Sequence, residues 1–428
     1  MNPLVALLYE GTARAARLGA ILVPAGGGKT RRSFAARRGV TARWAEWGKH
    51  HRDPSRPLVW MHAPSVGEGL QARPVLDALR RLCPELQLAY TFFSPSAEPF
   101  ARALAVDGAD YLPFDTAADA RAMLDAIRPD ALVFSKLDVW PTLTREAAAR
   151  GVHLALTSAT MSEGSGRGSI FARALLREAY ARLERVGAID ADDADRLVAL
   201  GVRATAIRVT GDTRYDQVWA RAAAVDRRSE LLLPLASPRP TLVAGSTWPA
   251  DERALGAAWS AVRAQVPGAR LIIAPHEVTP DHLAAIERWA AATGAPIARL
   301  GAASAVDADV VLVDRIGVLG DLYALATAAF VGGGFHAAGL HSVLEPAAFG
   351  APVLFGPQYG RSRDAKLLLA CGGGASGESA AELGERLIAW LTTSAAESAG
   401  AAARELVRSG LGASQRSAEL VLGMMRGE

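Results

Sequence analysis

Short runs of apolar residues recur along the chain, and the segments between them carry apolar residues at helical spacing. Runs that are apolar at every position are typical of parallel strands buried on both faces of a sheet. In the first half of the chain, strands are predicted at 58–62, 86–92, 131–134, 152–157, 187–189 and 205–210. In the second half they are predicted at 241–244, 271–274, 310–313, 329–331 and 352–355. Helices are predicted in the intervals, for example at 69–81 and 117–127.

This alternation of strand and helix predicts an α/β fold with two Rossmann-like sheets. The 428 residues are enough for two domains. The first domain is predicted at 56–220 and the second at 221–428, with the N-terminal segment 1–55 preceding both. The most linker-like stretch is the Pro- and Ser-rich segment 234–240, and the tail at 380–426 is predicted to be helical.

The N-terminal segment at 3–23 is mostly apolar, but Glu10, Arg14 and Arg17 interrupt it. On a helical wheel these charges lie within about 60° of one another, which predicts an interfacial helix with a narrow polar stripe. The arginines that follow, which suit an anionic lipid surface, are Arg31, Arg32, Arg37, Arg38 and Arg43. The alternative is an amphipathic helix packed on its own protein. A membrane-spanning helix is disfavoured by the three charges, and a signal peptide by the lack of a clean apolar core.

Composition excludes several classes of protein. The net charge of +3 is too small to indicate a nucleic-acid partner. The two cysteines, Cys83 and Cys371, lie far apart in the chain and suggest no disulfide framework. No paired Cys and His spacing indicates a zinc site.

The most informative stretch is 328–357, where a predicted strand leads into Gly332, Gly333 and Gly334. Three glycines allow close approach to a ligand and positive φ, and ligands bind at the carboxyl ends of strands in such sheets. The pattern therefore predicts a phosphate-binding turn, although the glycines could equally form only a tight turn. Ser342 and Glu345 have the spacing of a capping box, which is the structural alternative to a ligand-binding role.

A second polar turn, His62-Ala63-Pro64-Ser65-Val66-Gly67-Glu68, follows the first predicted strand. Ser65 and Glu68 again have the spacing of a capping box. The functional alternative is that the Glu68 carboxylate takes a proton from a bound hydroxyl group. One side-chain conformation cannot satisfy both roles, so a catalytic Glu68 is expected to turn away from the Ser65 amide.

Several motifs together resemble one family. They are Gly-Gly-Gly-Phe at 332–335, Gly-Leu-His-Ser-Val-Leu-Glu-Pro at 339–346, Gly-Ala-Pro-Val-Leu-Phe-Gly-Pro at 350–357, and Trp-Met-His-Ala-Pro-Ser-Val-Gly-Glu at 60–68. These strings resemble the 3-deoxy-D-manno-octulosonic acid (Kdo) transferases. That family implies the GT-B architecture, with two Rossmann-like domains facing each other across a cleft. It also implies inverting, metal-independent transfer of Kdo from CMP-Kdo to lipid A precursor. By analogy, the last helix at 413–426 is expected to return to the first domain.

The resemblance assigns roles to individual residues. Glu68 is implied as the catalytic general base. Donor contacts are implied for Gly245, Ser246, Thr247, His276, Gly333, Gly334, His341, Ser342 and Glu345, with Glu345 on the ribose. Acceptor contacts are expected from Ser65, Gly67, Lys136, Asp138 and Arg167, although Lys136 and Arg167 could equally be solvated surface charges. Three departures from the family pattern are Ser342 for asparagine, Lys136 for an acid, and the lack of an arginine at 275–277.

The implied partners are the lipid A precursor and the inner-membrane surface, with no nucleic acid and no cofactor besides the donor CMP-Kdo. The protein is expected at the cytoplasmic face of the inner membrane, peripheral or anchored by its N-terminal segment, in lipopolysaccharide biosynthesis. Two other functions remain open. One is a sugar-nucleotide 2-epimerase of similar shape that uses a UDP-sugar, and the other is a non-catalytic membrane adaptor.

Overall fold

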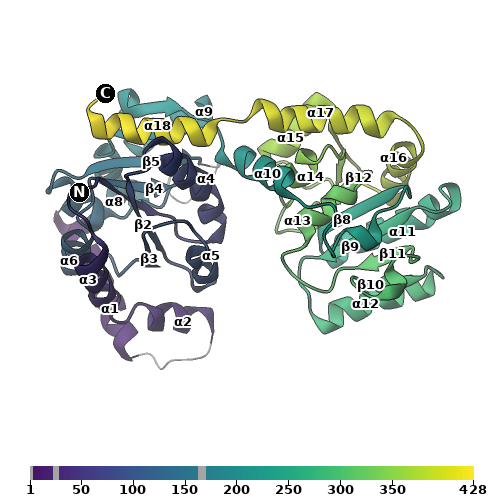
Figure 1. Cartoon of the computed structure of the whole chain (residues 1–428), viewed down its shortest axis with the longest axis horizontal. Coiled ribbons are helices and arrows are strands. Elements are labelled where there is room, and N and C mark those ends of the chain that lie inside the picture. Colours follow the sequence, from purple (N-terminus) through teal and green to yellow (C-terminus); the bar gives the residue numbers. More distant parts are fainter. Residues whose placement is uncertain (1–2, 23–27, 162–169) are drawn as a thin grey trace. The chain divides into compact units, whose positions relative to one another are not determined.

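The computed structural model describes residues 3–22, 28–161 and 170–428. The chain divides into two compact units. The first unit consists of Met1–Gln217 together with Leu411–Glu428, and the second of Val218–Gly410. Each unit contains one seven-stranded sheet, and all the strand pairs are parallel (Figure 1). The predicted α/β class with two Rossmann-like sheets is therefore confirmed.

The first unit alternates strands and helices along most of its length. Its strands are β1 (Leu58–His62), β2 (Gln87–Phe92), β3 (Gly108–Tyr111), β4 (Ala131–Ser135), β5 (His153–Ala159), β6 (Arg185–Ala188) and β7 (Ile207–Val209). Its helices are α1 (Pro3–Leu22), α2 (Lys29–Ala36), α3 (Val40–His51), α4 (Val66–Leu82), α5 (Glu98–Arg102), α6 (Ala117–Ile127), α7 (Pro141–Ala148), α8 (Ile170–Ala181), α9 (Ala191–Leu200) and α18 (Ala413–Arg426). The division between the units falls within α10 (Thr213–Ala224).

The strand order of the first sheet is β3-β2-β1-β4-β5-β6-β7. The chain therefore reverses its direction of travel across the sheet between β1 and β4, which are neighbours. Strand β1 is buried at every position because helices cover both faces of the sheet, as its uninterrupted apolar run predicted. The end of the chain belongs to this unit. In α18, Ala418, Val421 and Met424 join the same hydrophobic core.

The second unit repeats this plan. Its strands are β8 (Thr241–Thr247), β9 (Arg270–Pro275), β10 (Ile297–Arg299), β11 (Val310–Leu312), β12 (Ala328–Val331), β13 (Val353–Phe355) and β14 (Gly374–Ser376). Its helices are α11 (Pro249–Gln265), α12 (Pro280–Ala292), α13 (Leu319–Leu322), α14 (Leu344–Ala348), α15 (Arg363–Cys371), α16 (Ala380–Thr392) and α17 (Ala395–Ser409). The sheet order is β10-β11-β9-β8-β12-β13-β14, so the reversal falls between β8 and β12.

Every strand predicted from an apolar run is present, with ends that shift by a few residues. Three strands were missed, namely β3, β10 and β14. All three are edge strands. An edge strand has a neighbour on one side only, so it does not need an unbroken apolar run. Strand β3, with the sequence Gly-Ala-Asp-Tyr, is an example, since only Tyr111 is fully buried.

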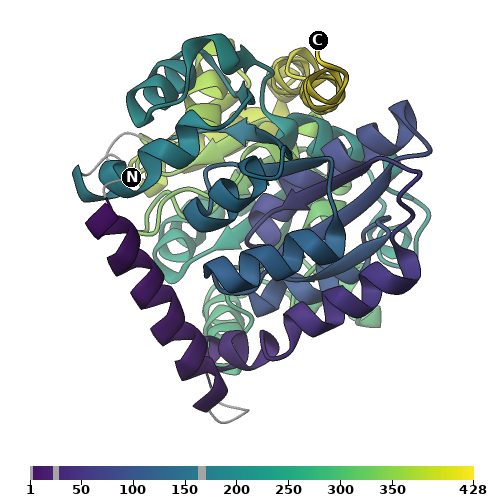
Figure 2. The same ribbon diagram turned by 90° about the vertical axis from the view of Figure 1, so that its left-hand side faces the viewer.

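Helix α1, the darkest purple ribbon in Figure 2, lies on the surface of the first unit, and polar side-chain contacts attach it there. The Tyr9 hydroxyl donates to buried Asp115 over 2.9 Å, Glu10 accepts from the Ala117 amide over 3.2 Å, and Arg17 pairs with Asp119 at 2.8 Å. Leu7, Leu8 and Leu18 are 70%, 59% and 59% exposed. Two members of the predicted polar stripe, Glu10 and Arg17, thus face the protein, while leucines face outward. Among the described helices, none has the length and hydropathy needed to cross a bilayer.

The predicted basic cluster is smaller than its sequence suggests. Arg37 is buried, and its guanidinium lies 3.5 Å from the centre of the Phe93 ring. Burial lowers the pKa of Arg37 to about 10. Arg43 forms an ion pair with Asp110 at 2.6 Å, and Arg38 donates to the Ala20 carbonyl oxygen over 2.9 Å, so at least three of the five arginines bond within the protein.

Candidate functional site

In each sheet, most of the predicted site residues that the structure describes lie near the carboxyl ends of the two strands where the direction of the chain reverses, and His276 follows β9. In the first unit these strands are β1, which leads into the Ser65–Glu68 turn, and β4, which leads into Lys136. In open α/β sheets the loops diverge at this reversal and leave space for a ligand. The topology therefore brings together two turns that are far apart in the sequence.

Glu68 lies in the first turn of α4, and other side chains hold both of its carboxylate oxygens. The Ser65 hydroxyl donates to Oε2, and the Lys136 ammonium lies 3.3 Å from Oε1. Ser65 also caps the helix by accepting the Gly67 amide over 3.2 Å. The Glu68 carboxylate thus accepts a hydrogen bond from the Ser65 hydroxyl group, and the oxygen of that group accepts the helix-capping bond from the Gly67 amide. The Glu68 side chain remains 19% exposed.

The environment of Glu68 favours its charged form. Burial opposes ionisation, but the hydrogen bond from Ser65 and the charge of Lys136 outweigh it, so the pKa of Glu68 lies below its ordinary value. Lys136 has a φ of 65°, in the left-handed region that a non-glycine residue rarely adopts. Such strain is found mostly where the surrounding structure imposes a functional geometry. Lys136 thus has an unusual backbone conformation at the end of β4, and its ammonium group forms an ion pair with Glu68.

Asp138 lies in a separate polar cluster. Its carboxylate accepts from the Trp140 indole over 3.1 Å and lies 3.2 Å from Nε2 of fully buried His62. The other ring nitrogen of His62 lies 3.0 Å from the Thr91 hydroxyl. Asp138 thus connects the end of β1 with the turn after β4, and its contact with acceptor stays a prediction. Arg167, also predicted to contact acceptor, lies outside the described residues.

In the second unit, Asp251 connects the turns that follow β8 and β12. Its fully buried carboxylate accepts the backbone N–H groups of Trp248, Gly333 and Phe335 over 2.9, 2.7 and 2.9 Å. Asp251 was not among the predicted site residues. The available signal was its place three residues after Trp248 in the first turn of α11, where a carboxylate accepts free amide groups.

The three consecutive glycines are required by the chain's own packing. A Cβ on Gly332 would lie 2.2 Å from the Ser246 carbonyl oxygen, and one on Gly334 would lie 2.4 Å from the Gly356 amide. Gly333 has a φ of 93°, and its amide already bonds to Asp251. The tight-turn alternative thus accounts for all three glycines. The Gly333 amide, in particular, is taken by a carboxylate of the protein itself.

The remaining predicted donor residues differ in their exposure to solvent. Gly245 and Thr247 are buried, and the Thr247 hydroxyl donates to Glu252 over 2.8 Å. Ser246 is half-buried with a φ of 54°, Ser342 is exposed, and His276 and His341 lie together.

The capping-box alternative for Ser342 and Glu345 is wrong. Helix α14 is capped by Val343 without a side-chain bond. Burial raises the pKa of the Glu345 carboxyl, and the charge of Arg221 partly opposes this shift.

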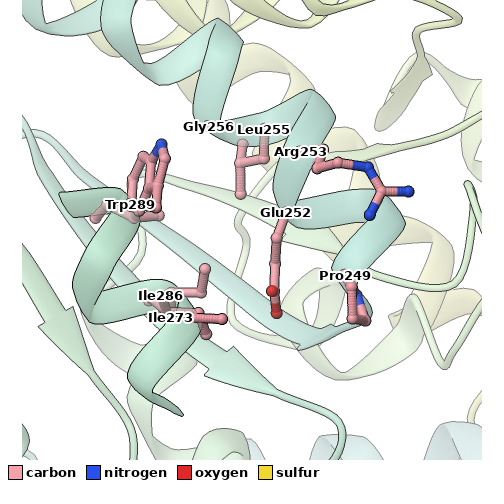
Figure 3. A pocket seen from close by; sticks show the side chains of 10 residues that line it. Pro249, Glu252, Arg253, Leu255, Gly256, Ile273, Ile286 and Trp289 are labelled. Atoms are coloured by element: carbon pink, nitrogen blue, oxygen red, sulfur yellow. The ribbon is translucent and has the colours of Figure 1, made fainter. Parts of the chain in front are cut away.

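One pocket of about 220 Å³ lies between α11 and α12 in the second unit (Figure 3). Its apolar lining includes Leu255, Ile273, Ile286 and Trp289, and Glu252 points into it. None of the predicted site residues lines this pocket. Over the described ranges, no group of three or more His, Cys, Asp or Glu side chains is arranged to hold a metal ion.

Comparison with known proteins identifies the family. The family model described as 3-deoxy-D-manno-octulosonic-acid transferase matches residues 33–217. The transferase of that name from Bordetella pertussis is 32% identical over 336 residues, which are 76% of this chain and 77% of that protein. The one from Haemophilus influenzae is 25% identical over 309 residues, 70% of each chain.

A solved structure, the UDP-GlcNAc 2-epimerase from Neisseria meningitidis, covers 87% of this chain and 100% of its own with a TM-score of 0.62. Its identity is 12%, so this likeness shows a shared fold and nothing more. The relatives in sequence and the motifs around Glu68 and Glu345 agree with one another. The chain belongs to the 3-deoxy-D-manno-octulosonic acid transferase family.

Proposed function

We propose that this protein transfers Kdo from CMP-Kdo to a lipid A precursor at the cytoplasmic face of the inner membrane, in lipopolysaccharide biosynthesis. The observation that carries the proposal is the ionised, partly exposed Glu68 held at the carboxyl end of β1 in a family of Kdo transferases. The donor is assigned to the second unit, where His276, His341 and the Asp251 turn gather at the carboxyl ends of β8, β9 and β12.

In the proposed mechanism, Glu68 accepts the proton of a lipid A hydroxyl group as the hydroxyl oxygen attacks the anomeric carbon of Kdo. The bond from that carbon to the phosphate oxygen breaks, and its electron pair leaves with CMP. A single displacement of this kind inverts the configuration at the anomeric carbon. Ser65 and Lys136 keep Glu68 ionised before the hydroxyl group arrives.

The direct test is incubation of the purified chain with CMP-Kdo and tetraacyl lipid A precursor, with CMP release and lipid mass as readouts. We expect a mass gain of one or more Kdo residues. The assay includes EDTA because we propose a metal-independent reaction, and turnover that requires added Mg²⁺ would contradict that part. Binding of UDP in preference to CMP, without transfer, would favour the epimerase alternative.

Replacement of Lys136 by Met is expected to move the acid limb of the kcat/KM profile to higher pH. The ammonium group stabilises the charged form of Glu68, so its removal raises the pKa of Glu68. The base then becomes protonated, and activity is lost, at a higher pH than in the wild type. Lys49→Met removes an ammonium group that is 70% exposed on α3, and this control should leave the limb in place. An unmoved limb in Lys136→Met would show that Lys136 does not set the charge of Glu68.

We also propose that α1 lies on the lipid surface through Leu7, Leu8 and Leu18, while Tyr9, Glu10 and Arg17 attach it to the first unit. At about 1 kcal/mol for each partly buried leucine, replacing all three by Ser should weaken binding to anionic vesicles roughly 100-fold. Vesicle co-sedimentation measures this. The control replaces Val209, Leu233 and Ile316, which are also exposed apolar residues, by Ser. Equal losses in both triple variants would contradict a specific role for α1.

A further inference from the structure

The pocket between α11 and α12 lies beside two contacts that join these helices (Figure 3). In the first contact, the Glu252 carboxylate of α11 lies 2.9 Å from Nε2 of His282 on α12. In the second, the Trp289 indole of α12 packs against Gly256 of α11, where a Cβ would lie only 2.6 Å from the indole nitrogen. Glu252, Gly256 and Trp289 all line the pocket. Specific side-chain contacts therefore connect the two helices that form its walls.

The walls of the pocket are largely apolar. Leu255, Leu271, Ile273 and Ile286 are at most 3% exposed, and they line it together with the half-buried Trp289. Protein interiors are normally packed without gaps of this size. A dry apolar cavity of about 150 Å³ is large enough to bind benzene. The pocket, at about 220 Å³, therefore has room for an aromatic ring with a short substituent.

The polar pair beside the pocket carries no net charge. Nδ1 of His282 lies 2.9 Å from the Glu277 carbonyl oxygen, which can only accept, so Nδ1 carries a proton. A second proton must lie between Nε2 and the Glu252 carboxylate, because two facing lone pairs would repel each other. With these two protons, the imidazole and the carboxyl group together have zero charge. Arg253 also lines the pocket, but it is exposed, so water solvates its charge.

Glu252 can still accept a further hydrogen bond. The Thr247 hydroxyl donates to Oε1 over 2.8 Å, and Nε2 of His282 lies 2.9 Å from Oε1 and 3.0 Å from Oε2. Each carboxylate oxygen has two lone pairs, so Oε2 has capacity for one more donor. The Glu252 side chain is only 13% exposed, and it points into the pocket. The pocket thus combines an apolar space with one largely buried acceptor.

We propose that this pocket is a second small-molecule site, which binds an uncharged alcohol with an aromatic or branched apolar body and whose occupant donates its hydroxyl hydrogen to Glu252. The apolar walls select the body of the ligand, and the carboxylate selects the donor. An ion is disfavoured because it would lose its hydration without meeting a net opposite charge. None of the predicted donor or acceptor residues lines the pocket, so the inference goes beyond the proposed function and does not depend on it.

The test is titration of the full chain with para-fluorobenzyl alcohol, with line broadening in fluorine NMR as the measure of binding. Para-fluorotoluene has the same ring without a donor, whereas para-fluorobenzylamine and para-fluorobenzoate carry a positive and a negative charge. We expect the alcohol to bind at least about tenfold more tightly than each of the other three, because a hydrogen bond to a carboxylate is worth about that factor. Equal binding of para-fluorotoluene would overturn the role of Glu252, and tighter binding of an ion would overturn the uncharged class of ligand.

Two variants locate the bound alcohol. Ala285 is exposed and lines the pocket, so Ala285→Trp should fill the space and abolish binding while leaving the core intact. Ala291 is exposed on the same helix and does not line the pocket, so Ala291→Trp is the matched control that should bind as the wild type does. Binding that survives in Ala285→Trp, or a wild-type dissociation constant weaker than about 10 mM, would overturn the inference. Both results would leave the proposed Kdo transfer unaffected, since that reaction is measured by lipid mass.

Discussion

Replacement of Glu68 by Gln is expected to reduce Kdo transfer roughly 10²- to 10⁴-fold, the contribution typical of a general base. Glutamine has nearly the same shape and can still accept a hydrogen bond from Ser65, but it cannot take the proton of the attacking hydroxyl group. Lys136 loses its partner in this variant, yet its side chain is 40% exposed, so water solvates the charge. Fold and CMP affinity should therefore remain at wild-type level.

Transfer is measured as the rate of lipid mass gain at saturating CMP-Kdo, and CMP affinity is measured by calorimetry. Asp77→Asn provides a matched control, because Asp77 is an exposed acid on the same helix, α4. That control should retain the wild-type rate. A Glu68→Gln variant that turns over within about threefold of the wild type would exclude Glu68 as the base, since base catalysis contributes far more.

The second large effect is expected for Asp251→Ala. The substitution leaves the N–H groups of Trp248, Gly333 and Phe335 without their acceptor in a buried turn. At about 1–3 kcal/mol for each unsatisfied group, and allowing for partial relaxation, the free energy of unfolding should fall by about 3–5 kcal/mol. For a unit of this size such a loss lowers Tm by roughly 10 °C.

The turn that carries His336 and His341 should loosen in the same variant, so CMP affinity is expected to fall as well. Asp251→Asn keeps one acceptor oxygen and should lie between the wild type and the alanine variant. Asp281 occupies the first turn of α12 but is exposed, so Asp281→Ala is the matched control. Scanning calorimetry of the four proteins measures the series. A Tm for Asp251→Ala equal to that of the control would show that the three bonds do not hold the turn.

Most of the fold could be predicted because the central strands of a doubly covered sheet must be apolar on both faces. The run Leu58–His62 and the run Ala328–Val331 both show this, and both became central strands. Three of the four edge strands were not predicted, because solvent can replace one neighbour, and β7 is the exception. The sequence Gly-Ala-Ser of β14 contains no side chain that demands a sheet.

The candidate site could be predicted only in part. The motif around Ser65 and Glu68 located one carboxylate at the end of a strand, because helix start signals are local in sequence. That Lys136 would lie 3.3 Å from this carboxylate depended on β4 lying beside β1. Asp138 was predicted to contact acceptor, and only the fold shows that its carboxylate lies against His62 and Trp140.

Local chemistry was therefore determined by the sequence itself, including the strand–helix alternation, the polar turns at strand ends and the amphipathic N-terminal segment. The tertiary structure alone decided which turns meet. In the folded protein, Glu10 and Arg17 of α1 face the first unit, and the glycine turn packs closely against the chain's own backbone. His276 and His336 stack on Trp248, and His341 stacks on His276. The physical reason is that spacing along a chain sets the local conformation, whereas contacts across a parallel sheet depend on strand order, which no local spacing encodes.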